Sequence, residues 1–198
     1  MKIPQNYNVY IFDLDNTLYR ETDYLFPAFN QIGDYVFHKT GIKSSEIARY
    51  LQDEFISEGR KNLFDKLIEK FSLDKIAVQE LLQVLRNAET GTIILYQDAY
   101  DTLLSLKNLN KKIAIITNGT VQQQKNKIAH IDWKELNGYI DFVFSDETER
   151  KPSPKSINLY LVSNRISHDE VVFVGDGIED ERAATSAGII FIKSFFKG

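Results

Sequence analysis

The chain has 198 residues, of which 24 are basic and 28 are acidic, and its formal net charge is −4. This balance argues against a protein that binds a nucleic acid polymer or an anionic membrane surface, because such proteins normally carry a basic surplus. The absence of cysteine excludes disulfides, zinc–thiolate sites, iron–sulfur clusters and cysteine nucleophiles. No apolar run has the length of a signal peptide or of a membrane span, roughly 18 residues, so we expect a cytoplasmic protein.

The first predicted element is a buried strand at Val9–Phe12, which ends at Asp13. Further short apolar runs predict strands at residues 113–116, 142–144, 171–174 and 189–192. Runs that are apolar on both faces are typical of a parallel sheet with helices on both sides. Amphipathic stretches between them predict helices at residues 98–109, 121–131, 154–162 and 180–187. This alternation predicts an α/β fold with a doubly wound, Rossmann-like parallel sheet.

Residues 19–92 interrupt the alternation directly after the first strand. They contain no convincing strand, and they predict helices at residues 26–39, 44–57, 61–71 and 73–88. A crossover connection in such a fold needs far fewer residues. We therefore expect an α/β catalytic core of residues 1–18 and 93–198, with residues 19–92 inserted as a helical cap.

Polar side chains follow four of the predicted strands. Because the carboxyl ends of parallel strands meet at one edge of a sheet, we expect these side chains to lie together. They are Asp13 and Asp15, Thr117 to Gly119, Lys151, and the acidic pair Asp176 and Asp180.

Each of these groups has a chemical use. Paired carboxylates such as Asp13 and Asp15 can hold Mg²⁺ through oxygen ligands, or divide the work of nucleophile and general acid/base. A hydroxyl and free amides before a helix, as at Thr117, form an anion site. A positioned lysine can neutralise both a phosphate and a carboxylate. Each group alone has a structural reading as a turn, a helix cap or a surface lysine; together they indicate phosphoryl chemistry.

The set resembles the four motifs of the haloacid dehalogenase-like hydrolase superfamily. Residues 13–17 (Asp-Leu-Asp-Asn-Thr) are similar to its first motif, Thr117 to its second, Lys151 to its third and residues 175–180 to its fourth. The resemblance covers the whole chain, with the helical insertion at the place of the family's first-type cap. It implies a Mg²⁺-dependent phosphomonoester hydrolase that acts through an aspartyl-phosphate.

The resemblance also implies a role for each catalytic residue. Asp13 would be the nucleophile, and Asp15 would protonate the leaving group and then activate water. Thr117 would hydrogen-bond the transferring phosphoryl group, and Lys151 would balance its charge. An acid at Asp15 favours a phosphatase or phosphomutase over an enzyme that cleaves carbon–halogen bonds.

Further residues would bind substrate and metal. The resemblance implies that Leu14, Asn118 and Gly119 contact the phosphoryl group around their backbone amides. It implies Mg²⁺ ligands from Asp13, Asp176 and the backbone carbonyl of Asp15. The last motif departs from the usual pattern because Gly177 follows Asp176, and its second acid could be Asp180 or Glu181. Counting back from residues 187–188 favours Asp180, which would orient the other carboxylates.

The substrate expected is a small phosphorylated metabolite. The motif around Asp15 is similar to that of nucleotidase-type members, which makes a nucleoside 5′-monophosphate one candidate. Many sugar phosphomutases have Asp-Gly-Val where this chain has residues 15–17 (Asp-Asn-Thr), so we favour a phosphatase; a phosphomutase and a non-catalytic phosphate-binding relative are the alternatives. Arg60, in the cap loop of residues 58–62, is the candidate for leaving-group recognition, and its alternative role is to offset a helix dipole.

Overall fold

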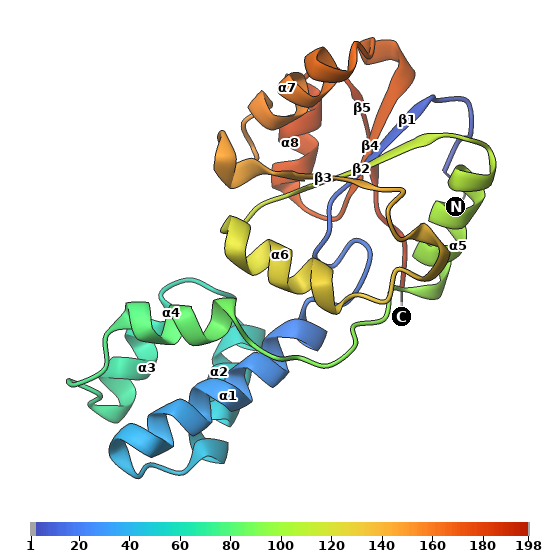
Figure 1. The fold of residues 1–198 in the computed structure, drawn as a ribbon. Coiled ribbons are helices and arrows are strands. Elements are labelled where there is room, and N and C mark those ends of the chain that lie inside the picture. The colour runs from blue at the N-terminus through green and yellow to red at the C-terminus, as the bar shows by residue number, and fades with distance from the viewer. Residues whose placement is uncertain (1–2, 198) are drawn as a thin grey trace. The chain divides into compact units, whose positions relative to one another are not determined.

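The structure, a computed structural model, describes residues 3–197. Its chain divides into two compact units, one formed by the residues up to Glu21 together with those from Thr92 onward, and one formed by Thr22–Gly91. Figure 1 shows the arrangement of elements within each unit. Within the described residues, no helix is both long enough and apolar enough to cross a bilayer.

The first unit is built on a five-stranded sheet with the order β3-β2-β1-β4-β5, in which all neighbours are parallel. The predicted α/β, Rossmann-like fold class is confirmed. The inner strands are almost wholly buried, whereas β3 and β5 are edge strands and are partly exposed. The strands are β1 (Val9–Phe12), β2 (Lys112–Thr117), β3 (Asp141–Phe144), β4 (Val171–Gly175) and β5 (Ile190–Lys193).

Helices cover both faces of this sheet. Helices α7 (Lys155–Asn164) and α8 (Ile178–Ser186) pack on the face that contains Ile11 and Phe173. Helix α5 (Gln97–Asn108) lies on the opposite side (Figure 1). Helix α6 (Val121–His130) follows β2 directly, which brings its side chains to the end of the sheet where the strands finish.

The second unit contains four helices and, among its residues, no strand. Its helices bury apolar stripes against one another, as amphipathic helices do. They are α1 (Thr22–Thr40), α2 (Ser44–Glu58), α3 (Leu63–Phe71) and α4 (Val78–Arg86).

Several predicted helix limits were wrong. The helix expected from residue 73 begins only after Ala77, whose N–H donates to the Glu80 carboxylate at 2.9 Å. Leu73 and Ile76 are buried, as expected, but they lie in a turn. Helix α1 starts at Thr22, several residues earlier than predicted, and its first turn already buries Tyr24 and Leu25.

Candidate active site

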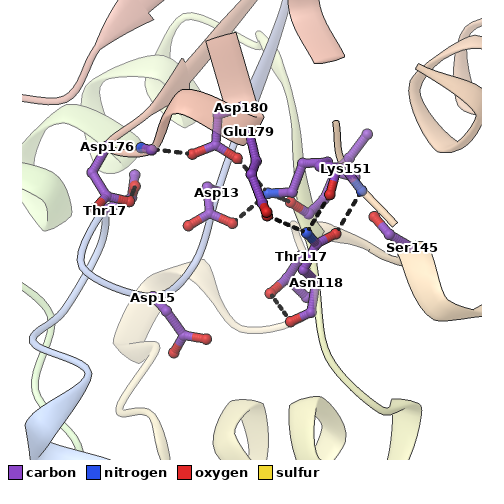
Figure 2. A network of polar contacts seen from close by, with 12 residues as sticks. Asp13, Asp15, Thr17, Thr117, Asn118, Ser145, Lys151, Asp176, Glu179 and Asp180 are labelled. Atoms are coloured by element: carbon purple, nitrogen blue, oxygen red, sulfur yellow. Dashed lines mark hydrogen bonds and ion pairs between the residues drawn. The ribbon is translucent and has the colours of Figure 1, made fainter. Parts of the chain in front are cut away.

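The carboxyl ends of three strands, together with the loop after a fourth, bring polar side chains to one edge of the sheet (Figure 2). Asp13 directly follows β1, Thr117 ends β2 and Asp176 follows β4. Lys151 comes from the loop between β3 and α7. All four residues belong to the first unit, so their arrangement is set by the sheet itself.

Lys151 is the cation at the centre of this group. Its side chain is almost fully buried, and Nζ lies 2.5 Å from Oδ1 of Asp13 and 2.6 Å from Oδ1 of Asp180. Nζ also donates to the carbonyl oxygen of Ile116 at 2.9 Å. Burial opposes the charged ammonium, but the two carboxylates outweigh it and raise the pKa of Lys151. The residue is therefore a fixed positive charge beside Asp13.

Three carboxylates lie together at this edge of the sheet, and two of them contact Lys151. Ligand oxygens of Asp13, Asp176 and Asp180 all lie within 4.8 Å of one another. Burial, with the Asp180 and Asp15 charges, raises the pKa of Asp13 to about 7 against the opposing pull of Lys151. Burial and the Asp180 charge also raise the pKa of Asp176. The cluster has an excess of negative charge and only oxygen donors, so its chemistry fits a hard divalent cation.

Of the two candidate second acids, Asp180 lies in the cluster. It is buried, and its Oδ2 accepts a hydrogen bond from the N–H of Gly177 at 3.1 Å. A Cβ atom at Gly175 would approach that carboxylate oxygen to 2.5 Å, so only glycine leaves room for it. Glu181, one residue further along α8, is exposed.

Asp15 lies close to Asp13 in sequence, but its carboxylate has other partners. Oδ2 is 2.5 Å from Nζ of Lys127 and 3.3 Å from Nε2 of Gln124, both on α6. Oδ1 accepts a hydrogen bond from the hydroxyl of Tyr19 at 2.5 Å. Figure 2 shows this carboxylate pointing away from those of Asp13 and Asp180.

These partners of Asp15 were missed in the sequence. Gln124 and Lys127 are each 1% exposed, although their residue types usually lie at the surface. Their spacing of three residues places them on one helix face, directly after the Thr117 turn. That spacing was a usable signal, but it is common on helices and does not by itself identify a buried face.

The residues expected to bind the phosphoryl group lie at the end of β2 and in the turn after β1. Thr117 is buried, and its Oγ1 accepts from Nε2 of Gln124 at 2.6 Å. Gly119 has a φ of +127°, which side chains rarely adopt. Leu14 has a fully buried side chain, which leaves only its backbone for such contacts.

Asn118 and Arg60 have different surroundings. The Asn118 side chain accepts from the N–H of Lys151 at 2.8 Å and donates to its carbonyl at 2.9 Å, so it fixes the loop that carries the lysine. It also donates to Glu179 at 3.0 Å. Arg60 belongs to the helical unit, where it follows Gly59 between α2 and α3.

Comparison with known proteins adds independent information. The family model described as haloacid dehalogenase-like hydrolase matches residues 10–193. An enolase-phosphatase E1 from Persephonella marina is 26% identical over 167 residues, which are 79% of this chain and 74% of the relative. A glyceraldehyde 3-phosphate phosphatase from Methanopyrus kandleri is 25% identical over 195 residues, which cover 92% and 82% of the two chains.

Solved structures show the same fold. A HAD phosphatase from Thermococcus onnurineus superposes with a TM-score of 0.61 at 24% identity, covering 96% of this chain and 89% of that one. CbbY from Rhodobacter sphaeroides, solved in complex with phosphate, gives a TM-score of 0.63 at 18% identity, with 94% and 85% covered.

Proposed function

Because the chain belongs to the haloacid dehalogenase-like hydrolases, we propose that it hydrolyses a small phosphomonoester through an aspartyl-phosphate on Asp13. Its similarity to curated phosphatases supports a phosphatase of this family. The observation that carries the proposed mechanism is the buried Asp13 carboxylate, held 2.5 Å from the Lys151 ammonium at the edge of the sheet. A nucleophile for phosphorus needs this kind of fixed, charge-compensated position.

The reaction proposed has two displacements. In the first, a carboxylate oxygen of Asp13 attacks phosphorus, the bond to the leaving-group oxygen breaks, and Asp15 gives that oxygen a proton. In the second, Asp15 takes a proton from a water molecule that attacks the aspartyl-phosphate, which releases phosphate and restores Asp13. One proton carrier thus serves both steps.

Binding of the phosphoryl group is assigned to donors at two strand ends. The Thr117 hydroxyl and the backbone N–H groups of Leu14, Asn118 and Gly119 are the proposed donors. Helix α6, which begins at Val121, adds the positive end of its dipole just beyond this turn. Donors fixed in place before substrate arrives stabilise charge on the phosphoryl oxygens without a cost of reorganisation.

Mg²⁺ is the proposed cofactor, and Asp13, Asp176 and the backbone carbonyl of Asp15 would hold it. Asp180 would orient these ligands through its contacts with Lys151 and Gly177. When bound, the cation supplies positive charge to the phosphoryl oxygens. The excess of carboxylates over ammonium groups supports this assignment.

Substrate choice is assigned to the helical unit, acting as a cap, because the core groups bind only what all phosphomonoesters share. One relative is named for glyceraldehyde 3-phosphate, which supports a small phosphorylated metabolite. A nucleoside 5′-monophosphate stays a prediction of the sequence. A phosphomutase would return an isomer of its substrate, and a non-catalytic relative would release no phosphate.

A phosphate-release assay tests the proposal. The purified chain would be given p-nitrophenyl phosphate and a panel of sugar phosphates, organic-acid phosphates and nucleoside 5′-monophosphates, with added Mg²⁺ or with excess EDTA. We expect release of inorganic phosphate with Mg²⁺ and its loss in EDTA. Full activity in EDTA would contradict the metal assignment, and no release from any compound would contradict the hydrolase assignment.

A further inference from the structure

The buried lysine of α6 is unexplained by the chemistry assigned so far. Lys127 is 1% exposed, and a buried ammonium is costly unless carboxylates compensate it. Its Nζ lies 2.5 Å from Asp15 and 3.8 Å from Oε1 of Glu21, both within the first unit. Lys127 is thus buried and in contact with a proposed catalytic carboxylate, so it is placed where it can affect the reaction.

The site contains two buried lysines, and each holds a different aspartate of the first motif. Lys151 contacts Asp13, and Lys127 contacts Asp15, both at 2.5 Å. As a result Asp13 joins Asp176 and Asp180 in the carboxylate cluster, whereas the Asp15 carboxylate is turned toward α6. Two carboxylates two residues apart would otherwise compete for the same cation, since both are hard oxygen ligands.

We propose that Lys127 is a positioning residue that keeps the Asp15 carboxylate out of the metal cluster and free for proton transfer. The inference rests on the proposed function of Asp15 as the proton carrier. Gln124 and Tyr19 complete the arrangement, because they donate to Oδ2 and Oδ1 of the same carboxylate. Without the ammonium, that carboxylate would be free to turn toward the carboxylate cluster, where a cation would hold it, and it would then be lost as an acid and base.

The alternative is that Lys127 only stabilises the fold as an ion pair. The two roles differ in their dependence on the leaving group. A nitrophenolate departs with little help from a proton, whereas an alkoxide needs one. Loss of positioning therefore lowers kcat/KM, which reports the step in which the leaving group departs, much more for an alkyl phosphate than for p-nitrophenyl phosphate. A purely structural loss lowers both rates alike.

The test is a double-mutant cycle with Lys127→Met and Asp15→Asn, assayed on glycerol phosphate and p-nitrophenyl phosphate with Mg²⁺. In the wild-type background we expect Lys127→Met to lower kcat/KM for glycerol phosphate about tenfold or more beyond its effect on p-nitrophenyl phosphate. In the Asp15→Asn background it should add less than about twofold, since the group it positions is gone. Lys125→Met, at an exposed position of the same helix, is the matched control.

Two outcomes overturn the inference while leaving the proposed function intact. One is an equal loss of kcat/KM on both substrates, and the other is a Lys127→Met effect of the same size with and without Asp15. If Asp15→Asn itself left both rates unchanged, the assignment of Asp15 would fail instead. Should Lys127→Met not fold, Lys127→Gln keeps a polar side chain that can donate a hydrogen bond but lacks the charge, and the same selective loss is expected or the inference fails.

Discussion

The two units of the molecule bury different kinds of side chain. In the helical unit, residues 22–91, the buried side chains are aliphatic or aromatic. All the buried charged, amide and aliphatic hydroxyl side chains that the structure describes belong to the other unit. They are Asp13, Thr17, Thr117, Gln123, Gln124, Lys127, Ser145, Lys151, Ser156 and Asp180.

The helical unit is therefore stabilised by apolar packing, whereas the α/β unit also buries polar groups that can take part in a reaction. Burying a charge costs free energy that apolar packing does not, so a fold gains nothing in stability from buried charges in place of apolar side chains. In the helical unit the ion pairs stay partly exposed, as between Lys39 and Glu80, and contribute little. We therefore expect substitutions of the buried polar residues in the α/β unit to change the rate of the reaction. Substitutions on the surface of the helical unit should change at most which substrate is used.

The largest effect is expected from Asp13→Asn. An amide is a far poorer nucleophile than a carboxylate, so kcat should fall by about 10³ or more with the fold retained. Phosphate release and circular dichroism measure the two properties. A variant that keeps a tenth of the wild-type rate would show that Asp13 is not the nucleophile.

Asp13→Asn also tests how burial of this carboxyl group affects the free energy of unfolding. Because the pKa of Asp13 is raised to about 7 in the folded chain and is about 4 when unfolded, the folded state binds the proton more tightly. The free energy of unfolding should then fall as pH rises from about 4 to 7. In Asp13→Asn this contribution is absent, so urea unfolding in EDTA should show a smaller fall over that window. A fall as large as in the wild type would contradict the burial argument.

Asp15→Asn should lower kcat by about 10² or more on an alkyl phosphate, because both displacements use its proton. The loss on p-nitrophenyl phosphate should be smaller in the first step, so phospho-enzyme should accumulate. Rapid quench with ³²P-labelled substrate would measure it. Equal losses of kcat/KM on all leaving groups would argue against the acid role.

Asp180→Asn should lower kcat by about tenfold to a hundredfold, the range found when a group that orients metal ligands is lost. Its neighbour on α8 provides the control, because Glu181 is exposed and Glu181→Gln should leave the rate within about twofold. The two variants are compared by measuring kcat at increasing concentrations of Mg²⁺. The reverse order of effects would assign the second acid to Glu181.

The smallest effect is expected in the helical unit. Arg60→Ala should lower kcat/KM by about tenfold for the best natural substrate, since a charged hydrogen bond contributes about 1.5–3 kcal/mol. Hydrolysis of p-nitrophenyl phosphate should change much less. Arg49→Ala, at an exposed position of α2, controls for the loss of any surface charge. Equal losses on both substrates would return Arg60 to a structural role.

The sequence predicted the sheet well and the helical unit less well. The inner strands are apolar on both faces, so Val9–Phe12 had no competing interpretation, and its limits were correct. Residues Leu73 and Ile76 continue the helical spacing into α4, but the chain there forms a turn that buries them without a helix. The spacing of apolar residues predicts which side chains are buried. The start of the helix depends on hydrogen bonds such as the one from the N–H of Ala77 to the Glu80 carboxylate.

In the candidate site, residues that directly follow strands were easy to find, and residues on a helix face were not. The sheet topology alone brings Asp13, Thr117 and Asp176 to one edge. Lys127 has the same residue type as the exposed Lys125 two positions earlier. They differ only in which face of α6 packs against the rest of the unit. That depends on tertiary packing, which the residues around each lysine do not reveal.

Strand β1 lies far in the sequence from the strands with which it pairs, and this affects how the chain folds while it is being synthesised. Strand β1 pairs with β2, which starts at Lys112, and with β4, which starts at Val171. On the ribosome β1 therefore emerges long before either partner, while the helices of residues 22–91 make mostly local contacts and can form first. A nascent apolar strand is exposed to aggregation during that interval. Charges that flank an apolar strand oppose such aggregation, and Asp13 and Asp15 stand at that position just after β1.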